Sequence, residues 1–549
     1  MKMLNYFYLK KENKLQNNIV VTLFFLFFFL IGSYVYDSYG ISLDEEGTRA
    51  HGFMTLKYIY EIFFPLQVSI IDNYITVPKL SEFFSNDHGA FLDTFFAFIE
   101  INFGLDQSKE YYLIRHYICF VIFFIGVYFF YLLAKFKFND WRFGILASAF
   151  LVLSPRIFAE SFYNNKDLAF MSLFIISLYC CLKFIYKPNI KHAVTFAFTS
   201  ALATDLRLMG IFLPILSLFF IFIMSLRNKS FIKKNLVPIF LFLILTPSFI
   251  IIFWPYLWSD PLVNFLIAFK KFSAFPWIGK NLYFGQYIDA NYVPWHYSLV
   301  WISITTPIIY TLFFIFGFLI ISKRILERLL SIKENKEYND LWRGKKEMLD
   351  FLILLNFFLP IFLVITLNST LSDGWRHLYF VYPSFLLISL YGLDRLLKRN
   401  RKYKYIISFT VICLLINVFN MIKIHPYQYA YFNFLAGKNI EKKFDADYWA
   451  LSNKQALEYI LDKSTKNPIK VYRASNMNLN TSKKIFSEKI KKKIHIVSDK
   501  SQADFIISNG RYWTGNPSAK FAKIPNNFAI YKEIIVNRVK IVSIFRKKF

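Results

Sequence analysis

Residues 19–46 read IVVTLFFLFFFLIGSYVYDSYGISLDEE, an apolar run that is followed at once by the acidic cluster Asp44-Glu45-Glu46. The run is long enough to cross a bilayer, because a membrane-spanning helix needs about 17–25 mainly apolar residues. A basic stretch precedes it, but no small-residue cleavage site follows. We therefore interpret the run as a retained membrane anchor, with carboxylates at the surface where the first helix ends.

The composition of the whole chain supports a polytopic membrane protein. The mean hydropathy is +0.38, and 56% of the residues are hydrophobic and 21% aromatic, which excludes an ordinary soluble domain. Hydropathy predicts about eleven spans, of which the third and fifth are short. These spans centre near 19–36, 113–134, 143–154, 168–186, 192–203, 209–226, 236–255, 298–322, 349–368, 377–393 and 405–421.

The net charge of +29 would suggest nucleic acid in a soluble protein, but the membrane spans give it another explanation. Lys and Arg concentrate in alternate connections between spans, whereas the short connections on the other side carry few. By the positive-inside rule, the N-terminus is cytoplasmic and the acidic cluster lies on the outer face. We expect a multi-pass protein of a bacterial inner membrane.

Three parts of the chain are expected to differ in structure. Residues 1–18 form a cytoplasmic segment, and residues 19–421 form an α-helical membrane domain. Within it, the long loop 37–112 contains two amphipathic stretches, 49–63 and 89–103, which predict helices in the membrane interface. Residues 422–549 form a small outer α/β region, with a helix at 453–463 and strand-like runs at 469–472, 494–497, 505–507 and 528–545.

Asp44 and Glu45 are the candidate catalytic residues. A carboxylate at the outer membrane surface is well placed to take a proton from a hydroxyl or amine that attacks a sugar held at the bilayer boundary. The alternative is structural, since the same residues would suit a solvated acidic loop or a cap for a helix that starts near Gly47.

Cations on the outer side are the candidate ligands of a phosphate. Arg156 and Lys166 lie between the third and fourth spans, and Arg376 opens the tenth span against the positive-inside trend. For the first two, the alternative is contact with lipid headgroups. Further candidate substrate-binding residues lie in the polar segments on this side: Asp167, Arg207, Trp375, His377 and His425. Asp167 would equally suit a cap of the fourth span, and His377 a structural histidine.

The sequence contains no Walker loop, no GxGxxG after a strand and no HExxH. No metal site is therefore assigned from these motifs. Because a nucleotide cradle is missing from the sequence, a sugar donor would be lipid-linked.

Five ordered stretches on the outer side resemble the GT-C superfamily, specifically the bacterial branch of glycosyltransferase family 39 that is similar to protein O-mannosyltransferases and aminoarabinose transferases. They are Ile41–Gly47, Ser154–Asp167, Asp373–Pro383 (DGWRHLYFVYP), His425–Asn433 and Asp445–Ser452. The resemblance implies a polyprenyl-phosphate sugar donor and inversion at the anomeric carbon. It places the base at Asp44, with Glu45 as neighbour or substitute, and phosphate contacts at Arg156, Lys166 and Arg376.

The resemblance leaves three matters open. Transfer from lipid monophosphates in this family generally needs no metal, but some other GT-C enzymes bind a divalent cation, for which Asp44 and Glu45 are the candidates here. The branch acts on proteins, lipids and polysaccharides, so the acceptor does not carry over. The rival readings are a transporter or flippase of a lipid-linked sugar, which needs intramembrane charges and access from both faces, and a non-catalytic glycan-binding subunit.

Overall fold

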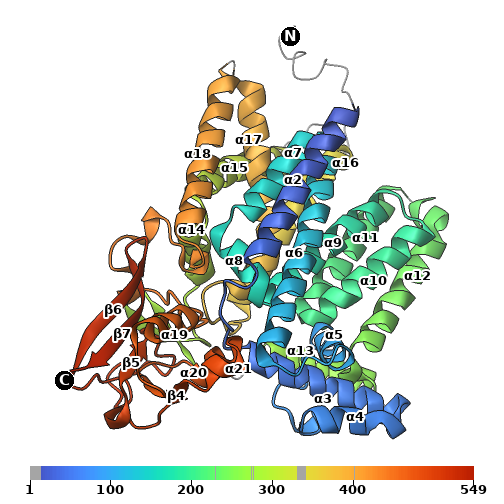
Figure 1. Ribbon diagram of the computed structural model, residues 1–549. Helices are drawn as coiled ribbons and strands as arrows, with labels where there is room; N and C mark the ends of the chain where they lie inside the picture. The colour runs from blue at the N-terminus through green and yellow to red at the C-terminus, as the bar shows by residue number, and fades with distance from the viewer. Residues whose placement is uncertain are drawn as a thin grey trace.

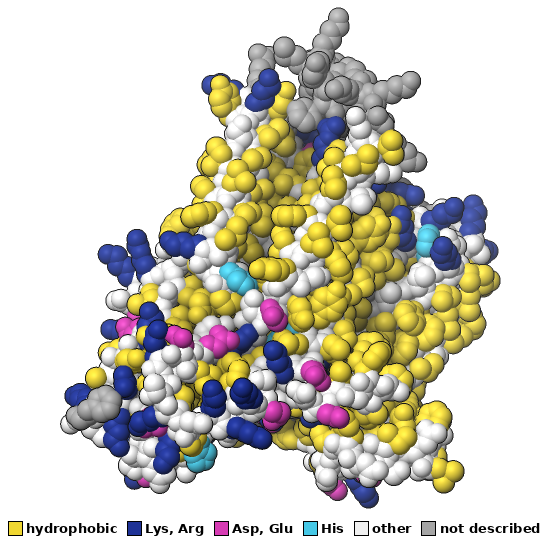
Figure 2. Space-filling view, viewed as in Figure 1, with side chains coloured by type: hydrophobic (Ala, Val, Ile, Leu, Met, Phe, Trp, Pro, Cys, Tyr) yellow, Lys and Arg dark blue, Asp and Glu magenta, His cyan; other side chains and the backbone are white. Residues whose placement is uncertain are grey.

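The structure is a computed structural model that describes residues 14–228, 230–273, 275, 277–330, 342–400 and 402–548. Long helices form a bundle, and most connections gather at the end of the bundle that faces away from the N-terminus (Figure 1). We call this end, which also carries the C-terminal β-sheet, the loop end. Apolar side chains cover the helices on the face shown in Figure 2, whereas Lys and Arg side chains lie at both ends of the bundle and acidic side chains lie mainly at the loop end.

The helices of the bundle follow one another along the chain, with short turns at the opposite end such as residues 139–140 and 187–189. In the described residues, nine helices are long and apolar enough to cross a membrane, or up to ten if one bent pair counts as a single span. The bundle helices are α2 (Lys14–Val35), α6 (Ser108–Phe138), α7 (Trp141–Val152), α8 (Pro155–Tyr163), α9 (Asp167–Tyr186), α10 (Ile190–Leu206), α11 (Phe212–Arg227), α12 (Ser230–Phe253), α14 (Tyr297–Thr305), α15 (Ile308–Leu330), α16 (Gly344–Thr366), α17 (Tyr382–Arg399) and α18 (Tyr403–Lys423).

The α-helical polytopic fold class is confirmed, and the two short spans explain the difference from eleven. The helix α10 has 17 residues, and it packs between α9 and α12 as a bundle member. The helices α7 and α8 meet at an angle of 72°. Pro155 lacks the N–H that would continue the first helix, and it starts the second one as its first residue.

Aromatic rings fill much of the core between these helices. Phe150 of α7 stacks on Tyr310 of α15 with ring centroids 4.1 Å apart, and Phe314 of α15 stacks on Phe385 of α17 at 4.4 Å. Rings of this size bury large apolar areas and interlock in few orientations, so they fix how the helices face one another.

The first long loop folds into α3 (Glu45–Phe63), α4 (Val68–Tyr74) and α5 (Phe91–Asn102), which confirms the two predicted helices. The helix α3 crosses α5 closely at Gly52, where a Cβ atom would lie 2.2 Å from the carbonyl oxygen of Asp93. The second long loop, between α12 and α14, adds α13 (Pro261–Ser273) and a hairpin of β1 (Lys280–Tyr283) and β2 (Gln286–Asp289), which the sequence analysis did not predict.

The C-terminal region forms a mixed five-stranded sheet, as predicted in class. Its strands lie in the order β4-β3-β5-β7-β6; β4, β3 and β5 are parallel, and β6 and β7 form an antiparallel hairpin. The bounds are α19 (Ser452–Lys463), β3 (Ile469–Arg473), α20 (Leu479–Ser482), α21 (Glu488–Lys491), β4 (Ile494–Ile496), β5 (Phe505–Ser508), β6 (Phe528–Val536) and β7 (Val539–Lys547).

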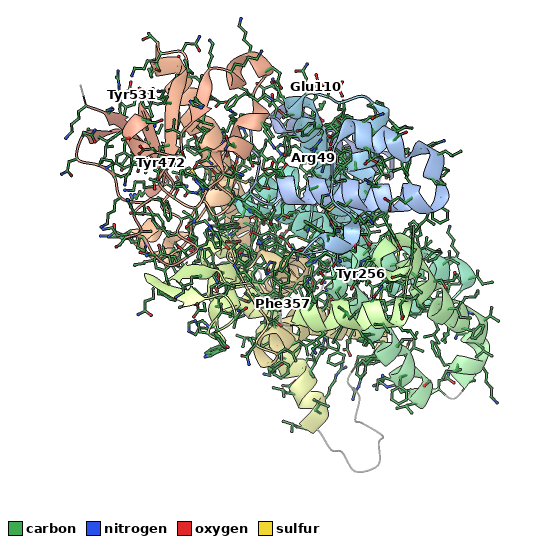
Figure 3. All side chains as sticks on the ribbon, turned by 90° about the horizontal axis from the view of Figure 1, so that it is seen from below. Arg49, Glu110, Tyr256, Phe357, Tyr472 and Tyr531 are labelled. Carbon is green, nitrogen blue, oxygen red and sulfur yellow. The ribbon has the colours of Figure 1, made fainter. Side chains whose placement is uncertain are left out.

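This C-terminal sheet domain docks against the first long loop and the start of α6. Glu46 forms an ion pair with Lys484 and accepts a hydrogen bond from Thr481, and the Ser108 hydroxyl donates to the Lys484 carbonyl at 2.7 Å. Seen onto the loop end, the part of the sheet domain with Tyr472 and Tyr531 lies beside the loop with Arg49 (Figure 3). The site described next lies where these parts meet.

Candidate active site

Arg376 lies at the centre of a buried group of ion pairs at the loop end. Its Nη1 atom is 3.2 Å from Asp44 Oδ2 and 3.2 Å from Asp167 Oδ2, and its Nη2 atom is 3.4 Å from Asp373 Oδ2. The guanidinium also lies over the ring of Trp449, 4.8 Å from the centroid. One cation is thus shared by carboxylates from three distant parts of the chain.

Two more arginines extend this group. Arg207 forms an ion pair with Asp167, and Arg511 of the C-terminal domain forms one with Asp373 and lies 3.7 Å from Asp445. Burial raises the pKa of Asp445, and the positive charge of Arg511 opposes this effect. We call these residues the loop-end network: Asp44, Asp167, Arg207, Asp373, Arg376, Asp445 and Arg511.

A tight turn before Arg376 sets the position of this side chain. Asp373 and Gly374 have φ angles of +61° and +75°, the left-handed region that an aspartate seldom adopts. The Asp373 N–H donates to Asn281 Oδ1 at 3.1 Å, which ties the turn to β1. The chain then enters a short 3₁₀ helix, Arg376–Val381, and the first side chain of that helix points into the network.

The acidic cluster sends its three carboxylates to three different partners. Asp44 faces Arg376, and 47% of its side chain remains exposed. Glu45 is buried; it accepts the Ser42 N–H at 2.6 Å, and its other oxygen lies 2.9 Å from His116 Nε2 of α6. Glu46 docks the C-terminal domain through Lys484. Asp44 is the member of this cluster that combines exposure with a place in the network.

Asp44 and Glu45 do not form a cation site in this arrangement. One oxygen of Glu45 accepts the Ser42 N–H, and the other lies beside His116 Nε2. The Asp44 carboxylate faces the Arg376 guanidinium and not Glu45. Among the residues that the structure describes, no group of three His, Cys, Asp or Glu side chains is placed to hold a metal ion.

A second polar group surrounds Lys166, just before α9. In the described part of the chain, the Lys166 ammonium has no hydrogen bond or ion pair, although the side chain is half-buried. Burial lowers the pKa of His51 and of His88, and the nearby charge of Lys166 lowers both further. Burial also raises the pKa of Asp93 to about 6, against the effect of Lys166.

His377 follows Arg376 in the chain and is half-buried. It lies close enough to Arg376 and Arg207 of the network to interact with their charges.

Arg156 lies apart from the network, in a box of aromatic rings. Its guanidinium lies 4.6 Å from the ring centroid of Phe432 and 5.5 Å from that of Trp301, and its Nε donates to the Tyr431 carbonyl at 3.0 Å. The neighbouring Glu160, which the sequence analysis did not single out, is also fully buried. It accepts hydrogen bonds from the hydroxyls of Tyr379 and Tyr448 and from Asn164: 2.7, 2.8 and 2.8 Å.

Trp375 and His425 also lie outside the network. The indole of Trp375 donates to Thr305 Oγ1 at 2.9 Å and packs edge-on against Tyr379, which makes it part of the core. The His425 Nδ1 atom lies 3.1 Å from the Gln428 amide, and its ring meets Tyr39 edge-on. Of the predicted site residues, the structure brings Asp44, Asp167, Arg207 and Arg376 together.

Three members of the network were missed as candidates from the sequence. Asp373 and Asp445 each open one of the stretches that carry the family resemblance, and that position was a usable signal. Arg511 had no comparable signal, because it lies in the sheet domain, 135 residues after Arg376 by number, where no motif was recognised.

Comparisons with known proteins bear on the membrane domain. Residues 97–257 match the model of the family described as dolichyl-phosphate-mannose-protein mannosyltransferase, a segment that contains Arg156, Lys166, Asp167 and Arg207. This match confirms the resemblance to the GT-C membrane glycosyltransferases. No curated protein matches the chain.

Two solved structures of ArnT from Cupriavidus metallidurans are similar to this chain. The crystal structure bound to undecaprenyl phosphate is 13% identical, with a TM-score of 0.44, and the match covers 95% of this chain and 97% of that chain. The apo crystal structure is 12% identical, with a TM-score of 0.45, and the match covers 96% of this chain and 98% of that chain.

Proposed function

We propose that this protein is an inverting glycosyltransferase of a bacterial inner membrane, which moves a sugar from a polyprenyl-phosphate donor to an acceptor at the outer face. The matched family is named for transfer of mannose from dolichyl phosphate to protein. The observation that carries the proposal is the half-exposed Asp44 carboxylate, held 3.2 Å from Arg376 beside further buried charges. In this proposal, residues 19–421 form the catalytic membrane domain and residues 422–549 the outer α/β region.

Asp44 is the proposed base. A carboxylate oxygen can take the proton of an attacking hydroxyl or amine. Its exposure leaves one side open to an incoming hydroxyl or amine. Glu45 lacks that opening, because it is buried against His116 and Ser42, and it supports the start of α3 instead.

The proposed contacts of the donor phosphate are Arg376 and Arg207 of the loop-end network, together with Lys166, which directly precedes Asp167 of that network. Lys166 has no ion-pair partner among the described residues, and the Nε atoms of Arg207 and Arg376 are buried without a hydrogen-bond acceptor in that same part of the chain. A buried donor without an acceptor costs about 1–3 kcal/mol. A phosphate oxygen would satisfy such donors, and their charges would stabilise the leaving group.

The proposed reaction is a single displacement at the anomeric carbon. Asp44 takes the proton of the acceptor, whose oxygen or nitrogen forms the new bond to that carbon. The bond between the carbon and the phosphate oxygen breaks at the same time, and its electron pair stays on the polyprenyl phosphate. The configuration inverts because the nucleophile enters opposite the leaving group.

The test is an assay of purified protein with radiolabelled polyprenyl-phosphate monosaccharides, with membrane extract as the source of acceptor. We expect wild type to transfer or release sugar and Asp44→Asn to lose at least about 100-fold of turnover while it still binds the donor. The matched control is Asp37→Asn, an exposed carboxylate of the same loop. Turnover by Asp44→Asn at the wild-type rate would show that Asp44 is not the base. Movement of the donor across the membrane without sugar transfer would favour a transporter.

A further inference from the structure

Arg511 brings the C-terminal domain into the loop-end network. Only 7% of its side chain is exposed, and it forms its ion pair with Asp373 across the boundary between the sheet domain and the membrane domain. The rest of its charge faces Asp445, which is also buried and accepts the Leu282 N–H at 2.9 Å. A charge is seldom buried at a domain boundary unless its partners are fixed.

The sheet presents Arg511 from the edge where its parallel strands end. Arg511 follows β5 by a turn in which Gly510 has a φ of +72°, and its N–H donates to Asn509 Oδ1 at 3.2 Å. Its carbonyl accepts the N–H of Asn476, which follows the neighbouring strand β3, at 2.9 Å. In open α/β sheets this edge is the usual place for ligands, and here it holds a carboxylate of the membrane domain.

The same turn is held at further points. Within the C-terminal region, the Asn509 amide donates to the Asp447 carbonyl at 2.9 Å, and on the side of the membrane domain the Lys280 N–H donates to the Trp513 carbonyl at 2.7 Å. The rings of Trp513 and Trp277 stack with centroids 5.5 Å apart. The backbone of Arg511 is therefore held from both sides, so its guanidinium is delivered to Asp373 with little freedom.

The charges explain why such a cation matters. Asp373 is shared between Arg511 and Arg376, and Arg376 in turn is shared with Asp44 and Asp167. Without Arg511, Asp373 would be a buried carboxylate with Arg376 as its remaining ion pair. An unpaired buried charge is costly, so the Arg376 guanidinium would shift toward Asp373 and away from Asp44.

We infer that Arg511 is a positioning residue of the site, which holds Asp373 so that Arg376 stays shared between Asp44 and Asp167. The inference rests on the proposed function, since it treats Asp44 and Arg376 as reacting-site residues. It makes the C-terminal domain a structural part of the catalytic site, in addition to any contact the domain makes with the acceptor.

The test compares full-length Arg511→Gln with Arg538→Gln, an exposed arginine of the β6–β7 turn in the same domain. We expect Arg511→Gln to lower kcat by about 100-fold with a smaller change in the KM for donor, because a displacement near 1 Å in a site costs about this much. Arg511→Lys should recover most of the rate, and adding Asp373→Asn to Arg511→Gln should restore part of it, since that change removes the competing carboxylate.

A purely structural role predicts a different pattern. The two changes would then multiply in their effects on kcat, as independent changes do, and that result would overturn the inference. Equal kcat values for Arg511→Gln and Arg538→Gln would also overturn it. If Arg511→Gln does not fold, the double variant decides: a folded protein with recovered turnover supports the inference, and a folded inactive one overturns it. If neither variant folds, the kcat of Arg511→Lys decides: recovery of most of the wild-type rate supports the inference, and a folded inactive protein overturns it.

Failure of the proposed function gives a separate signature. Asp44→Asn is measured in the same series, and if it turns over normally, the base is wrong whatever Arg511 does. If Asp44→Asn is inactive and Arg511→Gln behaves like its control, the base stands and the positioning role falls.

Discussion

The two ends of the helical bundle both contain buried ion pairs, but they are built differently. At the opposite end, Asp350 of α16 is shared by Lys137 of α6 and Arg324 of α15, so each of its oxygens has a partner. All three side chains come from long helices of the bundle. At the loop end, the network comes from turns and helix starts, and the Nε atoms of Arg207 and Arg376 have no acceptor among the described residues.

This difference separates a structural role from a functional one. A buried ion pair with both partners satisfied fixes how helices pack, and removing one partner lowers the free energy of unfolding. Buried donors without acceptors lower stability unless a ligand completes them. We therefore expect the loop end to bind an anion, and the ion pairs at the opposite end to stabilise the packing of the helices.

The largest expected effect comes from neutralising one shared aspartate at each end. Asp350→Asn leaves the buried Lys137 ammonium without its counter-charge, so we expect a loss of about 3–5 kcal/mol in the free energy of unfolding. The turnover of the protein that remains folded should not change. Asp167→Asn releases Arg207 and Arg376 at the loop end, so turnover should fall by about 100-fold.

Thermal unfolding in detergent and sugar transfer per folded molecule measure the two effects. The comparison between the ends would break if Asp350→Asn lowered turnover per folded molecule as much as Asp167→Asn did. It would also break if Asp167→Asn changed stability alone.

A smaller effect is expected at Lys166. Lys166→Ala removes a half-buried ammonium that has no ion-pair partner in the described part of the chain. If this charge contacts the donor phosphate, the dissociation constant for donor should rise about tenfold, with stability unchanged within about 0.5 kcal/mol. Equilibrium binding of a polyprenyl phosphate measures this, with Lys79→Ala, an exposed lysine of the first long loop, as the control. Equal affinities in the two variants would assign the phosphate to other cations.

A further effect is a dependence of stability on pH at the loop end. Burial raises the pKa of Asp93 to about 6, while Asn165 donates to its carboxylate at 2.6 Å. Because this folded-state pKa lies above the unfolded value near 4, the contribution of Asp93 to stability is present below about pH 4. It is lost as the pH rises to about 6, over a range of up to about 3 kcal/mol.

The stability of wild type relative to Asp93→Asn should therefore fall between pH 4 and pH 6 and stay level above that range. Unfolding curves of both proteins across this range measure it, and Asp72→Asn, an exposed carboxylate of the same loop, is the control. A stability difference that is constant with pH would show that Asp93 is ionised in the folded protein throughout.

Much of the fold followed from the sequence because its signals are local. Apolar runs identified the spans, and alternating patterns identified the strands of the sheet domain. The predictions were weakest where a helix is bent or short: Pro155 breaks the third span, and α10 has 17 residues. The β1–β2 hairpin was missed because its strands, KNLY and QYID, contain a single β-branched residue, whereas β3, β4 and β5 each contain two.

The sequence by itself determined a helical membrane protein whose polar motifs gather on one side, with an acidic cluster after the first span and a small α/β domain at the end. Length, hydropathy and residue period suffice for this, since each is read from neighbours in the chain. The tertiary structure decided which carboxylate of the cluster faces the network, that Arg156 lies among aromatic rings, and that Arg511 completes the group. Arg376 and Asp44 are 332 positions apart. A contact at that distance depends on how whole helices and loops pack, so no local pattern of residues encodes it.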